Sequence, residues 1–123
     1  MNALSVDYGS KQIGLAISIQ GVIQPLDVIK NDSNFLPQLQ KIITDYQIDK
    51  IFVGMSQGLF AVKTQEFVNW LKNMITLPIE TVEEAVSTIE ADQIYLANKK
   101  PKKDYKKNID AIAAAVILKR VIS

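Results

Sequence analysis

The sequence predicts an α/β fold in which a mixed sheet of five strands carries helices on both of its faces. Short apolar segments bounded by turn residues predict the strands, at residues 2–7, 13–19, 22–29, 50–54 and 77–82. Apolar residues with helical spacing predict helices between and after the later strands. The first three strands follow one another directly and form a meander, whereas the last two are added through helical crossovers and run parallel.

Turn and breaker residues set the limits of the strands. The first strand stops at the turn formed by residues 8–10, and Gly21 permits a tight turn between the second and third strands. The fourth strand ends at Gly54. Pro78 marks the start of the fifth strand or an edge position for it, because proline cannot donate a ladder hydrogen bond.

Four helices complete the predicted fold. Ser33 or Asn34 can cap the first, and Ser87, with Glu90 three residues later, opens the third with a capping box that leads to about Ala97. The last runs from about residue 104 to residue 121. Helical spacing is clearest in the first two, whose apolar residues are Phe35, Leu36, Leu39, Ile42, Ile43 and Tyr46 in one and Phe60, Thr64, Phe67, Leu71 and Ile75 in the other.

The composition excludes several kinds of chemistry. The chain has 123 residues, which we expect to form one domain spanning residues 1–123, and it contains neither cysteine nor histidine. Disulfides, a Ser-His-Asp triad, a Cys-His pair and an ordinary zinc site are therefore excluded. Metal chemistry would depend on carboxylates and other oxygen ligands, which suit Mg²⁺ or Mn²⁺.

The net charge of +1 conceals an uneven distribution. Residues 1–98 carry 6 basic and 11 acidic side chains, whereas residues 99–123 carry 8 basic and 2 acidic ones. Such a basic segment is typical either of a solvated loop or of a site for phosphate-rich partners. The cluster consists of Lys99, Lys100, Lys102, Lys103, Lys106 and Lys107.

The sequence shows neither a signal peptide nor an apolar run that approaches the ~18 residues of a membrane span. The most apolar stretch, residues 109–118, is interrupted by Asp110. We therefore expect a cytoplasmic protein that does not enter a membrane.

Acidic residues stand at positions where ligands collect in a mixed sheet, beyond the carboxyl ends of neighbouring strands. Asp7 ends the first strand, and Glu83 and Glu84 follow the fifth. Taken singly, these are ordinary turn and loop residues. Asp110 lies among apolar neighbours, where a carboxylate is costly unless it is paired or binds a metal. Together they favour a metal site.

Three segments resemble the YqgF (RuvX-like) family, in the same order and over the whole chain. The first is residues 7–16, which begin Asp-Tyr-Gly-Ser-Lys; the second is residues 83–91; and the third is residues 106–114, a lysine-rich loop followed by an aspartate on an alanine-rich helix. The family has a ribonuclease-H-like fold. It is described as a Holliday-junction resolvase and linked to maturation of the small-subunit ribosomal RNA precursor.

The resemblance implies a divalent-metal-dependent nuclease. Asp7, Glu84 and Asp110 would be its catalytic carboxylates and would together hold Mg²⁺ or Mn²⁺, which in such enzymes activates water and stabilises the leaving oxygen. Lys11 and the lysines of residues 99–107 would contact the backbone of the nucleic acid, RNA or branched DNA, without reading its sequence. Candidate accessory residues are Gly9, Ser10, Glu83, Ser87 and Tyr105, the last as a stacking platform beside the lysines.

The sequence also departs from the family pattern. Ala85 replaces an arginine, Gln12 replaces a basic residue, and the loop after Gly54 is shortened. A second hypothesis is therefore a nucleic-acid-binding relative with weakened or absent catalysis. A third is an actin-like nucleotide-binding fragment, since those ATPases share a similar Asp-x-Gly turn, although the chain is too short for their second lobe. The choice between RNA and DNA and the oligomeric state stay open at this point.

Overall fold

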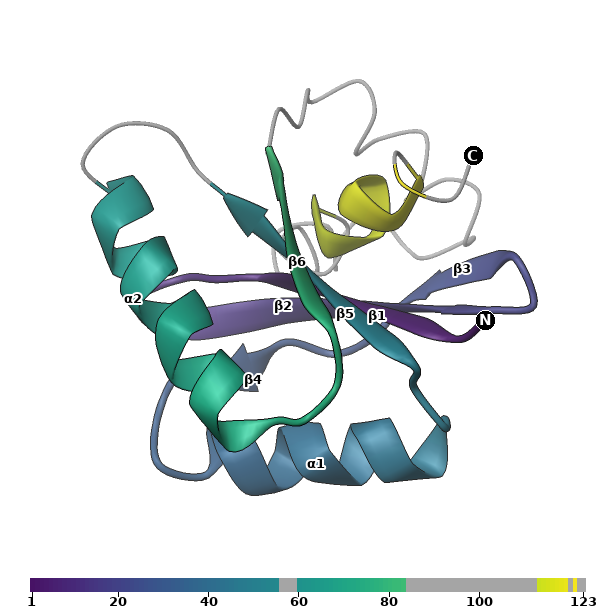
Figure 1. Ribbon diagram of the computed structural model, residues 1–123, viewed down its shortest axis with the longest axis horizontal. Helices are drawn as coiled ribbons and strands as arrows, with labels where there is room; N and C mark the ends of the chain where they lie inside the picture. The colour runs from purple at the N-terminus through teal and green to yellow at the C-terminus, as the bar shows by residue number, and fades with distance from the viewer. Residues whose placement is uncertain (56–59, 84–112, 120, 122–123) are drawn as a thin grey trace, which may run out of the picture.

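A mixed sheet with the strand order β3-β2-β1-β5-β6 forms the centre of the molecule, and β4 pairs with β2 outside this path (Figure 1). The computed structural model describes residues 1–55, 60–83, 113–119 and 121. The strands are β1 (Ala3–Asp7), β2 (Gln12–Ile19), β3 (Val22–Pro25), β4 (Ile29–Lys30), β5 (Lys50–Met55) and β6 (Ile79–Glu83), and the helices are α1 (Phe35–Asp45) and α2 (Phe60–Met74).

The strand directions agree with the sequence prediction. β1 pairs antiparallel with β2 and parallel with β5, and β5 pairs parallel with β6. The β2–β3 turn has positive φ at both central residues, Gln20 (52°) and Gly21 (83°), which is the pattern of a type I′ hairpin. Within the part of the chain that the structure describes, β6 is an edge strand, and it begins directly after Pro78, as predicted.

The prediction of a single strand over residues 22–29 is wrong. The structure has two short strands there, β3 and β4, which pair with opposite halves of β2, so that the sheet formed by the described residues has six strands instead of five. The backbone amide of Leu26 still donates to the carbonyl of Leu15 at 2.8 Å, and the chain then leaves the ladder at Asp27. Leu26 and Val28 remain half-buried on either side of that break, and so the apolar pattern continues through it.

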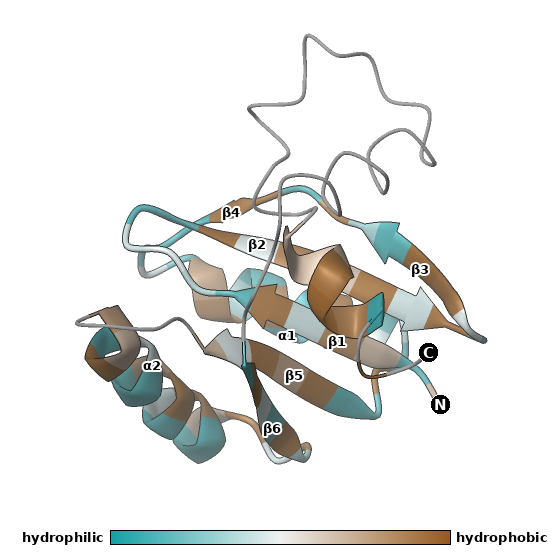
Figure 2. Ribbon diagram, turned by 90° about the horizontal axis from the view of Figure 1, so that it is seen from above, coloured by the Kyte–Doolittle hydropathy of each residue, from teal (hydrophilic) through white to brown (hydrophobic). Residues whose placement is uncertain are grey.

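Each face of the sheet is covered by helix. On one face, Leu4 and Val6 of β1 share a cluster of buried residues with Phe35 and Leu39 of α1 and with Val68 and Leu71 of α2. On the other face, Ala3, Ala16 and Phe52 pack with residues 114–118, which belong to a helical stretch over residues 113–119 (Figures 1 and 2). Full burial of one such aliphatic side chain contributes ~1.5–3 kcal/mol to stability.

The helices follow their predicted apolar faces. Asn34 occupies the N-cap position of α1 but makes no capping hydrogen bond with its side chain; its backbone amide instead donates to Asp32 Oδ1 at 2.9 Å. α2 buries Thr64, Phe67 and Leu71 as predicted. The predicted helix at residues 87–97 and the first part of the helix at 104–121 lie outside the described residues. No helix in the described ranges is long and apolar enough to cross a membrane.

Candidate active site

Asp7 is the last residue of β1, the central strand of the sheet. β1, β5 and β6 run parallel, and they end at the same edge, at Asp7, Met55 and Glu83 respectively. Ligands of mixed and parallel sheets bind beyond this edge, because the strands direct the loops that follow them to one place. The structure thus puts the first predicted carboxylate at the middle of the expected site.

The immediate surroundings of Asp7 are unusually free of side chains within the sheet. Its partner in β2 is Gly14 and its partner in β5 is Gly54. Since residues directly opposite one another project from the same face, neither neighbouring strand places a side chain beside the carboxylate. Asp7 itself is half-buried. Within the sheet, the carboxylate therefore has only glycine beside it, and both glycines are themselves buried.

Alternation along β1 assigns Asp7 to the face that carries the helix of residues 113–119. Ser5, two residues earlier on the same face, donates a hydrogen bond from its hydroxyl to the backbone carbonyl of Ala114 at 2.5 Å. Val6, between them, is buried on the opposite face with α1 and α2. The carboxylate of Asp7 and the alanine-rich helix therefore belong to the same side of the sheet.

Glu83 ends β6 at the same edge but on the other face. It lies opposite Met55, which packs against the core between the sheet and the helices α1 and α2. Asp7, in contrast, is level with Gly54 and Val82, and Val82 packs with the helix of residues 113–119. The two carboxylates thus project from opposite faces.

The turn between β1 and β2 carries three predicted site residues, Gly9, Ser10 and Lys11. Glycine is needed at position 9 because a Cβ there would lie 2.3 Å from the backbone oxygen of Gln12, and not because of a positive φ, which Gly9 lacks. Asn31 holds the turn: its side-chain amide donates to the carbonyl of Gly9 and its backbone amide to the carbonyl of Lys11, both at 2.9 Å. Ser10 and Lys11 are exposed.

The other predicted site residues lie outside the described residues. Within the ranges 1–55, 60–83 and 113–119, no three or more histidine, cysteine, aspartate or glutamate side chains are grouped so that they could hold a metal ion. Asp7, the residues 9–11 turn and the end of β6 lie at the same edge of the sheet. The residues that the structure does not describe are Glu84, Ser87, Lys99, Lys100, Lys102, Lys103, Tyr105, Lys106, Lys107 and Asp110.

Comparison with known proteins identifies the family. A family model described as "RuvX: Holliday junction resolvase" matches residues 1–123. The chain belongs to the RuvX family. A curated protein of Halothermothrix orenii, named "Putative pre-16S rRNA nuclease", is 32% identical over 130 residues, which cover 96% of this chain and 91% of that protein. The resemblance found in the sequence is confirmed, and the family is one of nucleases.

Two solved structures support the fold of this RuvX-family chain. Fowlpox virus resolvase, solved in complex with Holliday junction DNA, has a TM-score of 0.64 and 15% identity and covers 99% of this chain and 97% of its own. T. thermophilus RuvC, solved with a Holliday junction substrate, has a TM-score of 0.51 and 11% identity and covers 98% of this chain and 96% of its own. The ribonuclease-H-like fold predicted for the chain is confirmed.

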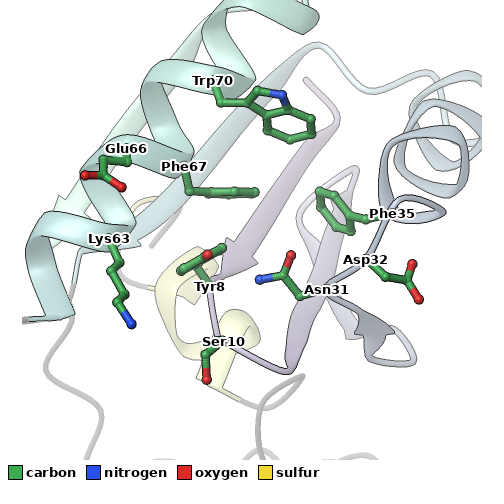
Figure 3. Close-up of a pocket in the computed structure, with 9 residues that line it drawn as sticks. All are labelled: Tyr8, Ser10, Asn31, Asp32, Phe35, Lys63, Glu66, Phe67 and Trp70. Carbon is green, nitrogen blue, oxygen red and sulfur yellow. The ribbon is translucent and has the colours of Figure 1, made fainter.

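A pocket lies between α1 and α2, on the sheet face opposite to that of Asp7 (Figure 3). The sequence did not predict it. It has a volume of about 560 Å³ and lies beside the residues 9–11 turn of this RuvX-family chain. Two of its walls are Trp70 and Phe67, the latter on the apolar helix face that the sequence predicts. The complete lining is Tyr8, Ser10, Asn31, Asp32, Phe35, Lys63, Glu66, Phe67 and Trp70.

Aromatic rings in close contact form the walls of this pocket. The ring centroids of Tyr8 and Phe67 are 4.4 Å apart in a stacked arrangement, and Phe67 is 5.9 Å from both Phe35 and Trp70. A sequence signal for the pocket exists in α2, where Lys63, Phe67 and Trp70 are spaced four and three residues apart and so share a helix face. That face carries an exposed lysine, a buried phenylalanine and a half-buried tryptophan.

Proposed function

We propose that this protein is a divalent-metal-dependent endonuclease that hydrolyses phosphodiester bonds in nucleic acid. The observation that carries the proposal is the position of Asp7, at the end of the central strand and flanked by Gly14 and Gly54. A carboxylate at the carboxyl end of a central strand, with glycine on either side, suits a metal ion and a phosphate, both of which need close approach. The names of the relatives support a ribosomal RNA precursor as substrate, and the name of the family supports branched DNA.

The proposed ligands of the metal are Asp7, Glu84 and Asp110, which would hold Mg²⁺ or Mn²⁺. The absence of histidine and cysteine from the chain restricts the ligands to oxygen atoms, which these two ions prefer. When bound, the metal supplies activation of the attacking water and stabilisation of the leaving oxygen.

Strand alternation supports Glu84, and not Glu83, as the second ligand. Glu83 projects from the face of Met55, away from Asp7. Successive residues of a strand alternate between faces, so a strand that continued by one residue would present residue 84 on the face of Asp7.

The contact between Ser5 and Ala114 supports Asp110 as the third ligand. Ser5 and Asp7 share one face of β1, and Ser5 contacts Ala114 directly. Residues four apart lie on the same side of a helix, and Asp110 precedes Ala114 by four positions in the sequence. A helix that extended one turn before the described stretch would therefore direct Asp110 toward this face of the sheet.

The remaining residues of the site would bind and position the substrate. Lys11 in the β1–β2 turn and the lysines of residues 99–107 would attract the phosphate backbone without distinguishing bases. Asn31 would keep Lys11 in place, because it bonds to both ends of the residues 9–11 turn. Gly14 and Gly54 would keep the surface beside Asp7 clear for the scissile phosphate.

A cleavage assay tests this proposal. Wild type, Asp7→Asn and the control Asp27→Asn, which alters an exposed carboxylate between β3 and β4, are incubated with a precursor ribosomal RNA fragment, a single-stranded RNA and a four-way DNA junction. We expect wild type and Asp27→Asn to cleave at least one substrate in the presence of Mg²⁺ or Mn²⁺. EDTA should abolish this cleavage. Asp7→Asn should lose at least 100-fold in rate, within the usual range for loss of a catalytic group.

Two results would contradict the proposal. Undiminished cleavage by Asp7→Asn would remove Asp7 from the mechanism. Salt-sensitive binding by wild type, with no cleavage of any of the three substrates in either metal, would instead identify a non-catalytic nucleic-acid-binding relative, the second hypothesis of the sequence.

A further inference from the structure

We propose that the aromatic pocket between α1 and α2 receives an unpaired nucleobase of the bound strand, next to the nucleotide whose phosphate lies at Asp7. This inference rests on the proposed function, because it takes nucleic acid as the ligand and Asp7 as the position of the neighbouring phosphate. It assigns to the RuvX-family chain a second binding site, on the opposite face of the sheet from the carboxylates, and it makes an unstacked nucleotide part of what the protein recognises.

The size and walls of the pocket fit a base. Its volume of about 560 Å³ falls within the ~300–1,000 Å³ range of pockets that bind small organic molecules. Trp70 and Tyr8, which are half-buried, line the cavity, together with Phe35 and Phe67, which have 2% and 8% of their surface exposed. The ring of Tyr8 also stacks on Phe60, with 5.8 Å between the ring centroids. Bases stack on aromatic rings in proteins that bind single strands.

The polar lining of the pocket includes Lys63, Ser10 and Asn31, which can bind the rest of a nucleotide, and also two carboxylates, those of Asp32 and Glu66. Figure 3 shows Lys63 and Ser10 at the end of the pocket away from Trp70. Lys63 makes no ion pair with any residue in the described part of the chain, and so its ammonium group is available for a phosphate. Asn31 points toward the rings, and one of its amide hydrogens is used by the carbonyl of Gly9 (Figure 3). Its other amide hydrogen and its oxygen can pair with a base edge.

The pocket is connected to the candidate active site through the backbone of β1. Tyr8 follows Asp7 directly, with a spacing of ~3.8 Å between their Cα atoms. Asp7 projects from the face of the 113–119 helix, whereas the ring of Tyr8 stacks on Phe67 on the other side. A strand that passes over the end of β1 can therefore place a phosphate at Asp7 and the base of an adjacent nucleotide against Tyr8. Double-stranded nucleic acid cannot do this without losing a base pair.

The fluorescence of Trp70 provides a direct test, because it is the only tryptophan in the chain and lines the pocket. The Asp7→Asn variant, which we expect to bind without cleaving, is titrated with an eight-nucleotide single-stranded RNA and DNA, with an abasic oligonucleotide of the same length, and with a blunt duplex. We expect saturable quenching of Trp70 by the two single strands. The abasic strand carries the same phosphates but no bases, and it should leave the emission unchanged.

Variants of the pocket measure its contribution to affinity. In the same Asp7→Asn background, Tyr8→Leu removes the ring but keeps an apolar side chain, and it should weaken binding of the base-bearing strands by about tenfold. Tyr8→Phe keeps the ring and should bind within twofold of the parent. Lys63→Gln should weaken binding severalfold at low salt, whereas Lys72→Gln, on α2 but outside the pocket lining, serves as its matched control. Thermal unfolding verifies that each variant is folded.

The outcomes separate this inference from the proposed function. If single strands bind but leave Trp70 unquenched, and Tyr8→Leu binds them as tightly as the parent, the base pocket is overturned even where wild type cleaves its substrate. If wild type cleaves nothing but the base-dependent quenching and the effect of Tyr8→Leu are both seen, the pocket is established and the nuclease activity is not. Equal quenching by the abasic strand would also overturn the pocket, since it would show that phosphates alone cause the signal.

Discussion

The hydroxyl of Ser5 is hydrogen-bonded to the backbone carbonyl of Ala114, and this bond joins the central strand to a helix 109 residues later in the chain. Both groups are buried. The bond fixes the alanine-rich helix over the face of the sheet that also carries Asp7. It therefore connects the stability of the fold with the geometry of the candidate active site.

Removing this hydrogen bond should destabilise the protein. Ser5→Ala leaves a buried carbonyl without its side-chain partner, which costs about 1–2 kcal/mol and lowers the melting temperature by about 5 °C. Ser33→Ala, at an exposed position before α1, should change the melting temperature by less than about 1 °C. Thermal unfolding followed by circular dichroism measures both. Equal melting temperatures for Ser5→Ala and wild type would show that the bond contributes nothing.

The turn after β1 should not accept a side chain at position 9. Gly9→Ala would place a methyl group 2.3 Å from the backbone oxygen of Gln12, so the turn must shift, at a cost of about 1–3 kcal/mol. Gly21→Asn is the matched control, because position 21 has a positive φ of 83°, which asparagine tolerates, and no atom within 4 Å of an added Cβ. Urea unfolding gives both free energies. A Gly9→Ala variant more stable than Gly21→Asn would contradict this reading of the turn.

The space beside Asp7 should be needed for activity. Gly54→Ala adds a methyl group on the strand next to Asp7 and on the same face. We expect the cleavage rate to fall by about tenfold or more, since small displacements at a reacting centre have effects of this size. The circular dichroism spectrum should remain that of wild type. Full activity in Gly54→Ala would show that the scissile phosphate does not approach along this surface.

Metal binding can be detected without an activity assay. Excess Mn²⁺ should raise the melting temperature of wild type by several degrees, because a ligand that binds only the folded state stabilises it, by ~2.7 kcal/mol at a hundredfold excess over Kd. EDTA should reverse the shift. Asp27→Asn should respond like wild type and Asp7→Asn should respond weakly. The same shift in Asp7→Asn and wild type would mean that the ion binds elsewhere.

The lysine-rich segment should determine the salt dependence of binding. Changing both Lys102 and Lys103 to alanine should reduce the slope of log Kobs against log[salt] by about 0.7–0.9 per lysine, since each phosphate contact releases a counterion. The double change of Lys41 and Lys72, which are exposed on α1 and α2, is the control with the same loss of charge. Binding of a labelled oligonucleotide between low and moderate salt gives the slopes. Identical slopes in the two double variants would show that the lysine segment makes no special contribution.

The sequence pattern within each segment predicted most of the described helices and strands. This was possible because the limits and the apolar face of each element depend on residues within it or next to it. α2 follows the apolar spacing of Thr64, Phe67 and Leu71, and β6 begins after Pro78 as an edge strand. The division of the third strand into β3 and β4 was not predictable in this way. Leu26 and Val28 continue the apolar alternation through the break, and only the pairing with β2 reveals where the ladder stops.

The site was predictable in part. The position of Asp7 at a strand end follows from the turn at residues 8–10. Its glycine neighbours, in contrast, depend on the registers of β1 with β2 and with β5, which connect residues 7 and 47 positions apart and leave no local signal. The aromatic pocket depends in the same way on the packing of Tyr8, Phe35 and Phe67, which come from three separate segments.

The interruption between β3 and β4 also affects how the protein behaves toward other copies of itself. These two strands form one border of the described sheet, where unpaired amide and carbonyl groups would offer a template for another chain. Neither strand exceeds four residues, and Pro25 ends the longer one without an amide hydrogen to donate. An incoming strand would find no continuous ladder to extend. The broken border thus disfavours edge-to-edge association along this side of the sheet.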